Sequence, residues 1–478
     1  MRLDFPSDDV IAYARQISTA SLGDHSYVVV VGSEAIAIDI QRDLERFEPV
    51  LDGIDADLIG VFETHIHNDY VSGGKRLADA HDAAYYLPAN TGAPSGHTPM
   101  PDGETMQVGG WTVRAMHTPG HTYNHTSYVL ETPRGPVAIF SGGSMLVGAV
   151  GRSDLLGPEH TEALLRHQYA TAHRIAEDLP DPSVVAPTHG SGSFCSASDV
   201  ADTTSTIERE KLQNPALIAP TVEAFGLGQV AGYRKYPLYY RHMAPANLKP
   251  LGDPPGTPLP VVTELAEVEG VTIADTRPFA EYAAGHLPGS LNYPADNDDA
   301  VYMGWTLPWD QPLALVGDEE TVARVRTHLQ RIGWDQVVAR IEPSTMSDLV
   351  DGPLRTTEVR SFVDADLSQP IVDVRDPIEH QGGIVAGAAA VHVSDFAQDP
   401  TSYVDGDQVV IHCQTGYRAS GEAAVTIVDS SAAGNGTTGV RANDSAEVRC
   451  ETVSSVENAG TGFRFTGSST GVVEDGDA

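Results

Sequence analysis

The stretch that decides the fold of this chain is THIHNDY, residues 64–70, which follows the apolar run DLIGVF of residues 57–62. The apolar run predicts a buried strand, so the stretch is expected in a loop at the strand's end. A two-residue step points the rings of His65 and His67 the same way where the backbone stays extended, and Asp69 adds a carboxylate. Neutral imidazole binds zinc, iron and similar first-row metal ions. The stretch therefore predicts a metal-binding loop.

Two further histidines also follow strand-like segments. His121 lies in the turn HTPGHT after a strand predicted over residues 111–115, and His189 lies in PTHG after the apolar run 183–186. Strand-end histidines far apart in the sequence are what a site at the rim of a β-sandwich requires. His117, in the same turn as His121, is expected to support the site or to be structural. Surface positions or satisfied polar contacts are expected for His81, His97, His125 and His160.

These motifs resemble the metallo-β-lactamase fold, and within it the branch that holds glyoxalase II and the persulfide dioxygenases. The resemblance covers about residues 20–250 and implies an αββα sandwich with a metal site. The family motif His-x-His-x-Asp-His is matched in its first five positions, and the later family ligands lie in turns like those described above. The residues that match the family's metal ligands are His65, His67, Asp69, His121 and His189.

The motif is incomplete at two positions. Tyr70 stands where the family has a final histidine, and Gly143 stands where it has a bridging aspartate. A phenol with a pKa near ~10 is a poor ligand at neutral pH, and glycine has no side chain to offer. We therefore expect one divalent metal ion rather than two, held by His65, His67 and His121 with an open position for water or substrate.

The resemblance to the persulfide dioxygenases favours Fe(II), with Zn(II) as the alternative. Those enzymes hold iron with two histidines and the bridging aspartate, a facial triad. Because position 143 is glycine, the carboxylate would have to come from Asp69 or Asp154. Asp69 and His189 are therefore kept as additional ligands.

A second informative motif lies near the other end of the chain. A strand predicted over residues 409–412 leads into CQTGYRAS, residues 413–420. Backbone N–H groups and a helix dipole converge on such a loop, which lowers the thiol pKa of Cys413. Arg418 adds a positive charge for sulfite or thiosulfate. With the preceding DVR of residues 373–375, this loop resembles the rhodanese sulfurtransferases, in which the cysteine carries a persulfide.

A related segment lies between the two motifs. IADTR, residues 273–277, and GHLPGS, residues 285–290, resemble the opening of a rhodanese, but LALVGDEE, residues 313–320, has no cysteine at the active-loop position. We expect this repeat to be folded and catalytically silent. A helix over 321–332 and a strand over 337–341 continue an alternation that indicates a parallel sheet.

The pattern of apolar residues supports the same architecture in the first part of the chain. Strands over 26–31 and 35–39 flank a hairpin turn at 32–34. Residues 44–54 and 164–179 have helical spacing. The predicted fold class is α/β: a metallo-β-lactamase αββα sandwich followed by two rhodanese-like α/β domains with parallel sheets.

The expected boundaries follow from composition and motifs. The metallo-β-lactamase-like domain spans 1–250, a proline-rich linker 251–262, the rhodanese-like domain without an active cysteine 263–350, and the one with Cys413 351–428. The tail, residues 429–478, has no Leu or Ile and is expected to be disordered.

The charge of the chain is strongly negative. Lys and Arg total 29 against 66 Asp and Glu, a net charge of −37. Such a surface repels nucleic acid and anionic membranes, so we expect neither as a partner. It indicates adaptation to a high-salt cytoplasm, where charges are screened. Three cysteines, no bilayer-length apolar run and no signal-peptide pattern favour a cytoplasmic location.

Together the two resemblances imply an enzyme of sulfur metabolism. It would oxidise a low-molecular-weight thiol persulfide with O₂ to sulfite, while Cys413 transfers sulfane sulfur to or from sulfite or thiosulfate. Two alternatives stay open: a metal-dependent thioester hydrolase of the glyoxalase II type, and a non-catalytic sulfur-carrier or scaffold protein.

Overall fold

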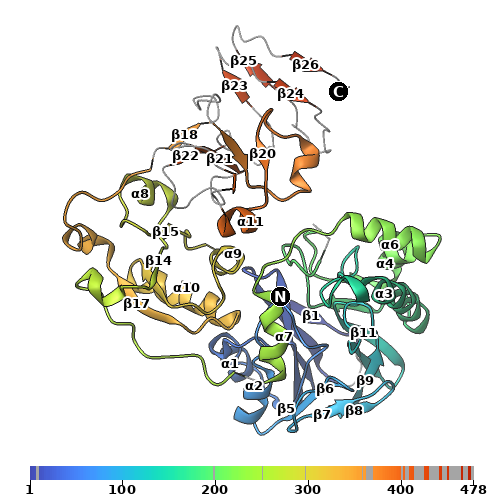
Figure 1. Cartoon of the computed structure of the whole chain (residues 1–478). Coiled ribbons are helices and arrows are strands. Elements are labelled where there is room, and N and C mark those ends of the chain that lie inside the picture. The colour runs from blue at the N-terminus through green and yellow to red at the C-terminus, as the bar shows by residue number, and fades with distance from the viewer. Residues whose placement is uncertain are drawn as a thin grey trace. The chain divides into compact units, whose positions relative to one another are not determined.

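The computed structural model describes residues 1–6, 10–196, 200–249, 251–296, 298–357, 359–361, 370–399, 402–403, 409–413 and 425–429, and the segments 441–443, 449–451, 464–466 and 472–474. The chain forms two compact units (Figure 1). The first comprises Met1–Pro255 with Thr327–Asp335, and the second Gly256–Arg326 with Gln336–Ala478.

The first unit contains two β-sheets. One sheet has the strand order β1-β2-β3-β4-β5-β6-β7, antiparallel from β1 to β4 and parallel from β4 onward. Its strands are β1 (Arg2–Asp4), β2 (Ala12–Thr19), β3 (Asp24–Val31), β4 (Glu34–Ile38), β5 (Asp57–Phe62), β6 (Ala84–Pro88) and β7 (Thr98–Met100). The predicted hairpin is thus β3 and β4, joined at Gly32 with φ +61°, and the predicted metal strand is β5.

The other sheet has the order β13-β12-β11-β10-β9-β8, in which only β11 and β12 run parallel. Its strands are β8 (Thr105–Val108), β9 (Trp111–His117), β10 (Thr126–Thr132), β11 (Gly135–Gly142), β12 (Val184–Pro187) and β13 (Ser205–Thr206).

Side chains that alternate along the strands build three packed layers. Val29 and Val31 of β3 join Tyr128 and Phe140 in the core between the sheets. Val28 and its alternate neighbours pack instead against helices that cover the first sheet, and a third cluster lies between the second sheet and its own helices. Strands buried on both faces read as continuous apolar runs, which is the pattern seen here. The predicted αββα sandwich is confirmed.

Helices cover the outer face of each sheet (Figure 1). Near the first sheet lie η1 (Leu44–Arg46), α1 (Glu48–Asp52) and α2 (Gly74–Ala80), and near the second lie α3 (Pro158–Asp178), α4 (Ile207–Gln213), α5 (Pro215–Ile218) and α6 (Val222–Ala231). Helix α7 (Tyr240–Leu248) also lies in this unit. Helical structure over 44–54 and 164–179 is as predicted.

The register of the parallel strands brings the ends of β4 and β5, and those of β11 and β12, to the same edge of their sheets. Ile38 of β4 lies opposite Phe62 of parallel β5, so the chain leaves both strands at the same edge. In the other sheet, Gly142 of β11 lies opposite Pro187 of parallel β12. The start of β10 is joined to the loop after β5 by a hydrogen bond from the Thr126 amide to the Thr64 carbonyl (2.8 Å).

The second unit contains two parallel sheets. The first has the order β15-β14-β16-β17 and the second β18-β22-β21-β19-β20. Their strands are β14 (Thr272–Asp275), β15 (Leu291–Asn292), β16 (Leu313–Val316), β17 (Val337–Ile341), β18 (Val359–Ser361), β19 (Ile371–Asp373), β20 (Ala389–Ala390), β21 (Val409–Cys413) and β22 (Val425–Asp429). The helices are η2 (Leu265–Val268), α8 (Phe279–Ala284), α9 (Asp299–Thr306), α10 (Glu319–Arg331), η3 (Pro343–Asp348), η5 (Glu379–Gly382) and α11 (Val393–Gln398). The last turn of α10, from Thr327 on, is counted with the first unit. The predicted helix over 321–332, strand over 337–341 and parallel sheets are confirmed.

The linker and the tail were predicted from composition. Residues 251–260 contain neither helix nor strand. Most of the predicted disordered tail lies outside the described residues, and within it are two parallel strand pairs. These strands are β23 (Arg441–Asn443), β24 (Arg449–Glu451), β25 (Arg464–Thr466) and β26 (Val472–Glu474). The domain boundaries remain predictions. In the described part of the chain, every helix is too short or too polar to cross a lipid bilayer.

Candidate metal centre

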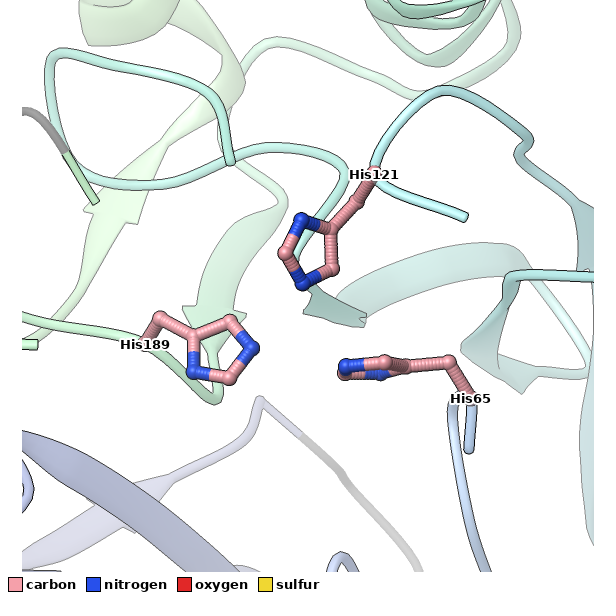
Figure 2. A group of neighbouring side chains, drawn as sticks. All are labelled: His65, His121 and His189. Carbon is pink, nitrogen blue, oxygen red and sulfur yellow. The ribbon is translucent and has the colours of Figure 1, made fainter. Parts of the chain in front are cut away.

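Three buried imidazoles meet at the rim of the sandwich. His65 follows β5, His121 lies in the loop between β9 and β10, and His189 follows β12. One ligand atom from each lies within 4.8 Å of those of the other two. Figure 2 shows one nitrogen of each ring turned toward the space that the rings enclose. Three imidazoles in this arrangement form a site for a divalent first-row metal ion.

The second nitrogen of each ring is held by a hydrogen bond. His65 Nδ1 lies 2.9 Å from Thr64 Oγ1, and His121 Nδ1 lies 2.7 Å from the carbonyl oxygen of Arg152. His189 Nδ1 lies 2.8 Å from Asp24 Oδ1. Carbonyl and carboxylate oxygens only accept, and the Thr64 hydroxyl donates its own proton to Asp39 (2.8 Å), so Nδ1 of each ring carries a proton and Nε2 is the atom left for a metal ion. Partners of this kind orient the histidines of metal sites.

The Nε2 atoms that face each other have no hydrogen-bond partner among the described residues, although all three side chains are almost completely buried. A buried acceptor without a partner is costly, and three in one place are rare. A metal ion would satisfy all three at once. The donor set therefore fits a metal ion.

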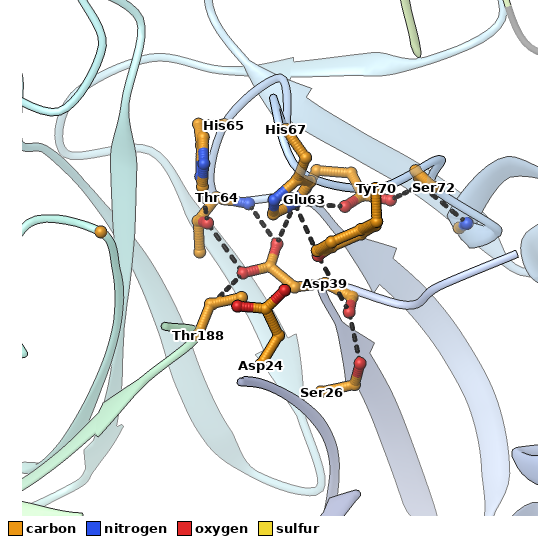
Figure 3. A network of polar contacts seen from close by, with 12 residues as sticks. Asp24, Ser26, Asp39, Glu63, Thr64, His65, His67, Tyr70, Ser72 and Thr188 are labelled. Carbon is orange, nitrogen blue, oxygen red and sulfur yellow. Dashed lines mark hydrogen bonds and ion pairs between the residues drawn. The ribbon is translucent and has the colours of Figure 1, made fainter. Parts of the chain in front are cut away.

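His67 lies beside this group but turns its Nε2 away from it. Nε2 lies 3.2 Å from Asp39 Oδ1, 3.1 Å from Glu63 Oε2 and 3.0 Å from the hydroxyl of Tyr70, as Figure 3 shows. The sequence predicted His65, His67 and His121 as the inner set, whereas the structure groups His65 and His121 with His189. The difference arises because β5 ends at Phe62, so the extended backbone needed to align the two rings does not continue through the loop.

All five residues expected as ligands nevertheless keep one buried polar atom without a partner in the described part of the chain. For His67 this atom is Nδ1, on the side of the ring opposite the carboxylates. For Asp69 it is Oδ1, while Oδ2 lies 3.2 Å from His189 Nδ1. The five atoms are His65 Nε2, His67 Nδ1, Asp69 Oδ1, His121 Nε2 and His189 Nε2.

Burial and neighbouring charges set the protonation of the cluster. Burial and the positive charge of His189 lower the pKa of His121 to about 3. Burial and the positive charge of His67 lower the pKa of His65 well below its usual value. Both rings are therefore neutral at neutral pH. Burial would lower the pKa of His189 too, but the carboxylates of Asp69 and Asp24 raise it to about 10, so a metal ion must displace a proton there.

The structure accounts for both departures from the family motif, Tyr70 and Gly143. Tyr70 is buried, and burial together with the negative charge of Asp39 raises the pKa of its phenol well above the usual value. It therefore stays a neutral donor. A Cβ on Gly143 would lie 2.5 Å from His121 Cδ2, and one on Gly151 would lie 2.9 Å from His121 Nδ1. The ring of His121 occupies space that a side chain at position 143 would need.

The other carboxylate considered from the sequence is engaged elsewhere. Asp154 accepts two hydrogen bonds from the buried guanidinium of Arg152, at 2.7 and 2.8 Å. Arg152 also stacks on the rings of Tyr233 and Tyr236. Of the two carboxylates considered from the sequence, Asp69 is therefore the one that adjoins the three imidazoles.

Most other histidines have the supporting positions that were expected. His125 is buried, stacks on His65 with ring centroids 5.0 Å apart, and accepts a hydrogen bond at Nε2 from the Gly143 amide (2.9 Å). His117 is exposed. Contacts with nearby oxygens are made by His81 (Glu48), His97 (Pro94) and His160 (Tyr123).

Sequence reasoning missed the acids behind the histidines. Asp39 accepts hydrogen bonds from the amide of Thr64 (2.7 Å), from its hydroxyl (2.8 Å) and from the hydroxyl of Thr188. Asp24 lies beside His189. The available signal was an aspartate directly after or at the start of an apolar strand, which is the position of both residues.

The second expected site is described only in part. Cys413 ends β21 and is buried in an apolar cluster with Val372, Val391 and Ile411. Arg418 and the remaining loop residues 414–420 lie outside the described residues. In the other repeat, β16 occupies the position of β21 in the sheet and is followed by Gly317 instead of a cysteine.

The two repeats share a buried ion pair. Arg277 binds Asp275 through Nη2 at 2.6 Å and the carbonyl of Gly285 at 2.8 Å. Arg375 binds Asp373 at 2.7 Å and the carbonyl of Gly383 at 2.8 Å. The same two contacts after the corresponding strand show that the two domains repeat one fold.

Comparison with known proteins agrees with both parts. The family model of the rhodanese-like domain matches residues 261–342 and 356–442. A hydroxyacylglutathione hydrolase of Gloeobacter violaceus is 28% identical over 214 residues, 40% of this chain and 84% of that protein. One of Pseudomonas putida is 30% identical over 176 residues, 34% of this chain and 68% of that protein.

Among solved structures, a metallo-beta-lactamase from Staphylococcus aureus is 28% identical with a TM-score of 0.64. The match covers 70% of this chain and 99% of that one, which is more of the chain than the first unit contains. Both resemblances inferred from the motifs are therefore confirmed.

Proposed function

Because this chain belongs to the metallo-β-lactamase-fold family of the hydroxyacylglutathione hydrolases and also carries two rhodanese-like domains, we propose that it has two linked activities. The first is the oxidation of a small thiol persulfide with O₂ to sulfite. The second is the transfer of sulfane sulfur through Cys413. The single observation that carries this proposal is a buried three-imidazole cluster in the same chain as a rhodanese-like domain whose central strand ends in cysteine.

The ligands proposed for one divalent ion, Fe(II) rather than Zn(II), are His65, His121 and His189, with His67 and Asp69 as additional ligands. Iron would supply the activation of O₂. Thr64, Arg152 and Asp24 fix the ring tautomers, so that each Nε2 lone pair is directed into the site. Burial of the cluster excludes bulk water, which protects a persulfide from side reactions.

The proposed reactions balance. A persulfide RSSH with O₂ and H₂O gives RSH, sulfite and two protons. The Cys413 thiolate then takes the outer sulfur of a second persulfide, releasing RSH, and its persulfide anion passes that sulfur to sulfite as thiosulfate, which restores the thiolate. Arg418 is proposed to hold the anionic acceptor. The product of the first site is thus the acceptor at the second.

A second function is favoured by the similarity to the hydroxyacylglutathione hydrolases, namely hydrolysis of a small-thiol thioester by water on a zinc ion. The family arrangement that activates water between two ions depends on a carboxylate where this chain has Gly143. The oxidation of a persulfide needs one ion only, which favours the first proposal.

The test uses the full chain, purified with its own metal. We expect iron near one ion per chain, oxygen uptake on at least one of a panel of low-molecular-weight thiol persulfides, and sulfite as the product. Cys413→Ser is the matched variant: oxygen uptake should persist while thiosulfate formation from persulfide and sulfite is lost. Zinc with thioester hydrolysis and no oxygen uptake would support the hydrolase instead, and a metal-free chain would support a scaffold.

A further inference from the structure

The first unit includes a segment that lies far from the rest of it in the sequence. Thr327–Asp335 contains the last turn of α10 and the residues that follow it, and it forms one compact unit with Met1–Pro255. The segment comes from the part of the chain that the first match to the rhodanese-like family covers, the repeat without an active-loop cysteine. Trp334 within it is completely buried. The metal-binding unit is therefore not built from its own stretch of sequence alone.

The end of α10 binds the loop after β5 through its backbone. The Arg331 carbonyl accepts a hydrogen bond from the amide of Val71 at 2.7 Å. On either side of this amide, Asn247 of α7 donates to the carbonyl of Tyr70 and accepts from the amide of Ser72. Arg331 therefore satisfies the buried amide between those two contacts, and the loop is held at three consecutive residues.

Two ion pairs hold the same segment against the chain that follows β4. Arg331 donates from Nε and Nη2 to Asp43 Oδ2, at 2.9 and 2.8 Å, and from Nη1 to Ser21 Oγ at 3.1 Å. Arg42, which is 1% exposed, donates to both carboxylate oxygens of Asp335 at 2.8 and 2.9 Å. Because these side chains are mostly buried, salt screens their attraction less than it screens surface pairs.

The ion pairs are close in sequence to a residue that positions a candidate ligand. Arg42 and Asp43 follow Asp39 by three and four residues. Asp39 Oδ1 lies 3.2 Å from His67 Nε2. The segment Thr327–Asp335 is thus bonded to both stretches of chain that frame the metal centre, the one after β4 and the loop after β5.

We propose that the segment Thr327–Asp335 is a positioning element of the metal centre, with Arg331 as its central residue. Ligands have to be held within about 0.5 Å of the geometry that a metal ion needs, so a loosened loop would bind the ion more weakly. Supplying this segment is then a function of the repeat without an active-loop cysteine, and it needs no sulfur chemistry. The inference goes beyond the proposed oxidation, because it applies whichever reaction the metal ion supports.

The test titrates Co(II) into the metal-free full chain, because the d–d absorption of Co(II) reports the geometry of its ligands. Arg331→Gln removes the charge and the three hydrogen bonds of the guanidinium. We expect the Co(II) affinity to fall by about tenfold, the lower end for residues that support metal ligands, with a changed absorption band. Arg331→Lys keeps the charge and should lie closer to the wild type. Arg324→Gln is the matched control, because Arg324 is exposed in the same helix and precedes the segment.

Asp335→Asn is the second variant and should shift the Co(II) affinity in the same direction by weakening the pair with Arg42. Wild-type Co(II) binding by Arg331→Gln, or by Asp335→Asn where the first variant does not fold, would overturn the proposal. Urea unfolding of the metal-free variants separates positioning from stability: a lower free energy of unfolding with an unchanged Co(II) affinity and spectrum also contradicts it. Failure of the proposed oxygenase is distinguishable, since it shows as absent oxygen uptake by the iron-loaded wild type and leaves the Co(II) results as they are.

Discussion

At the residue scale, one buried aspartate positions two of the candidate ligands. Asp39, with φ +54°, accepts the Thr64 hydroxyl, which in turn lies against His65 Nδ1, and the same carboxylate lies against His67 Nε2. A carboxylate donates no hydrogen bond, so a proton is held on His65 Nδ1, through the Thr64 hydroxyl, and on His67 Nε2 directly. The structure therefore prepares the rings for a metal ion rather than leaving them to rotate.

His121→Ala should remove the bound metal. The variant deletes one of three neighbouring imidazoles, and we expect metal affinity to fall by more than about tenfold. Metal analysis after dialysis against a weak chelator measures this. His117→Ala is the matched control, because His117 lies exposed in the same turn and should retain its metal. Equal metal in the two variants would contradict the assignment of His121.

Asp39→Asn should change how stability of the metal-free chain depends on pH. Burial alone would lower the pKa of His67, but Asp39 and Glu63 raise it well above the usual value. The folded state then binds this proton more tightly than the unfolded state. The resulting stabilisation is complete below about pH 6.5 and is lost as pH rises through the raised pKa.

We expect urea unfolding of the wild type to show a free energy that falls above about pH 6.5, and the Asp39→Asn variant to be less stable at neutral pH with a flatter decline. Asp82→Asn is the control, since Asp82 also has a positive φ (52°) but is exposed. A wild-type profile as flat as that of Asp39→Asn would show that His67 is not protonated in the metal-free state.

At the element scale, helix α7 holds the metal loop in place. Asn247, near its end, donates to the carbonyls of His67 (2.9 Å) and Tyr70 (2.8 Å) and accepts from the amide of Ser72 (2.8 Å). These three bonds satisfy backbone groups in a loop that belongs to neither sheet. A helix distant in sequence thus fixes the shape of the loop.

Asn247→Ala should destabilise the loop and weaken metal binding together. Buried carbonyls left without a donor cost on the order of 1–3 kcal/mol, so we expect a loss of that size in the free energy of unfolding. Chemical denaturation with and without added metal measures both effects. Arg241→Ala, an exposed change in the same helix, is the control. A metal affinity unchanged in Asn247→Ala would exclude this role for α7.

The pattern of apolar residues predicted the helices and strands that pack a whole face against a hydrophobic core. The continuous apolar runs of β3 and β5 and the spacing of α3 reflect faces packed on a core. The contribution of α7 was not predicted, because a single asparagine carries no periodic signal.

At the scale of the whole molecule, the net charge of −37 dominates. Like charges repel across the folded surface, and salt shortens the range of this repulsion to about 3 Å at 1 M. We expect the free energy of unfolding to rise as KCl increases from low to molar concentration, measured by urea unfolding.

A neutral osmolyte at matched osmolality is the control for that measurement and should not reproduce the rise at low concentration. If stability is the same at low and high KCl, the acidic surface is not an adaptation to salt.

The sequence by itself determined the five ligand candidates, the sandwich and the rhodanese repeats. Motif spacing and apolar runs are local properties, and a strand end can be read without knowing what lies opposite. The lack of a cysteine in the active loop of one repeat and the presence of Cys413 in the other were likewise evident from the residues at one strand end in each domain.

Only the tertiary structure decided how the ligands are grouped. His189 joins His65 and His121 because β5 and β12 end at one rim, and His67 turns to Asp39 because the loop leaves the extended path after Phe62. Ring direction depends on backbone angles and on partners distant in the chain, and neither is encoded in the spacing of a motif.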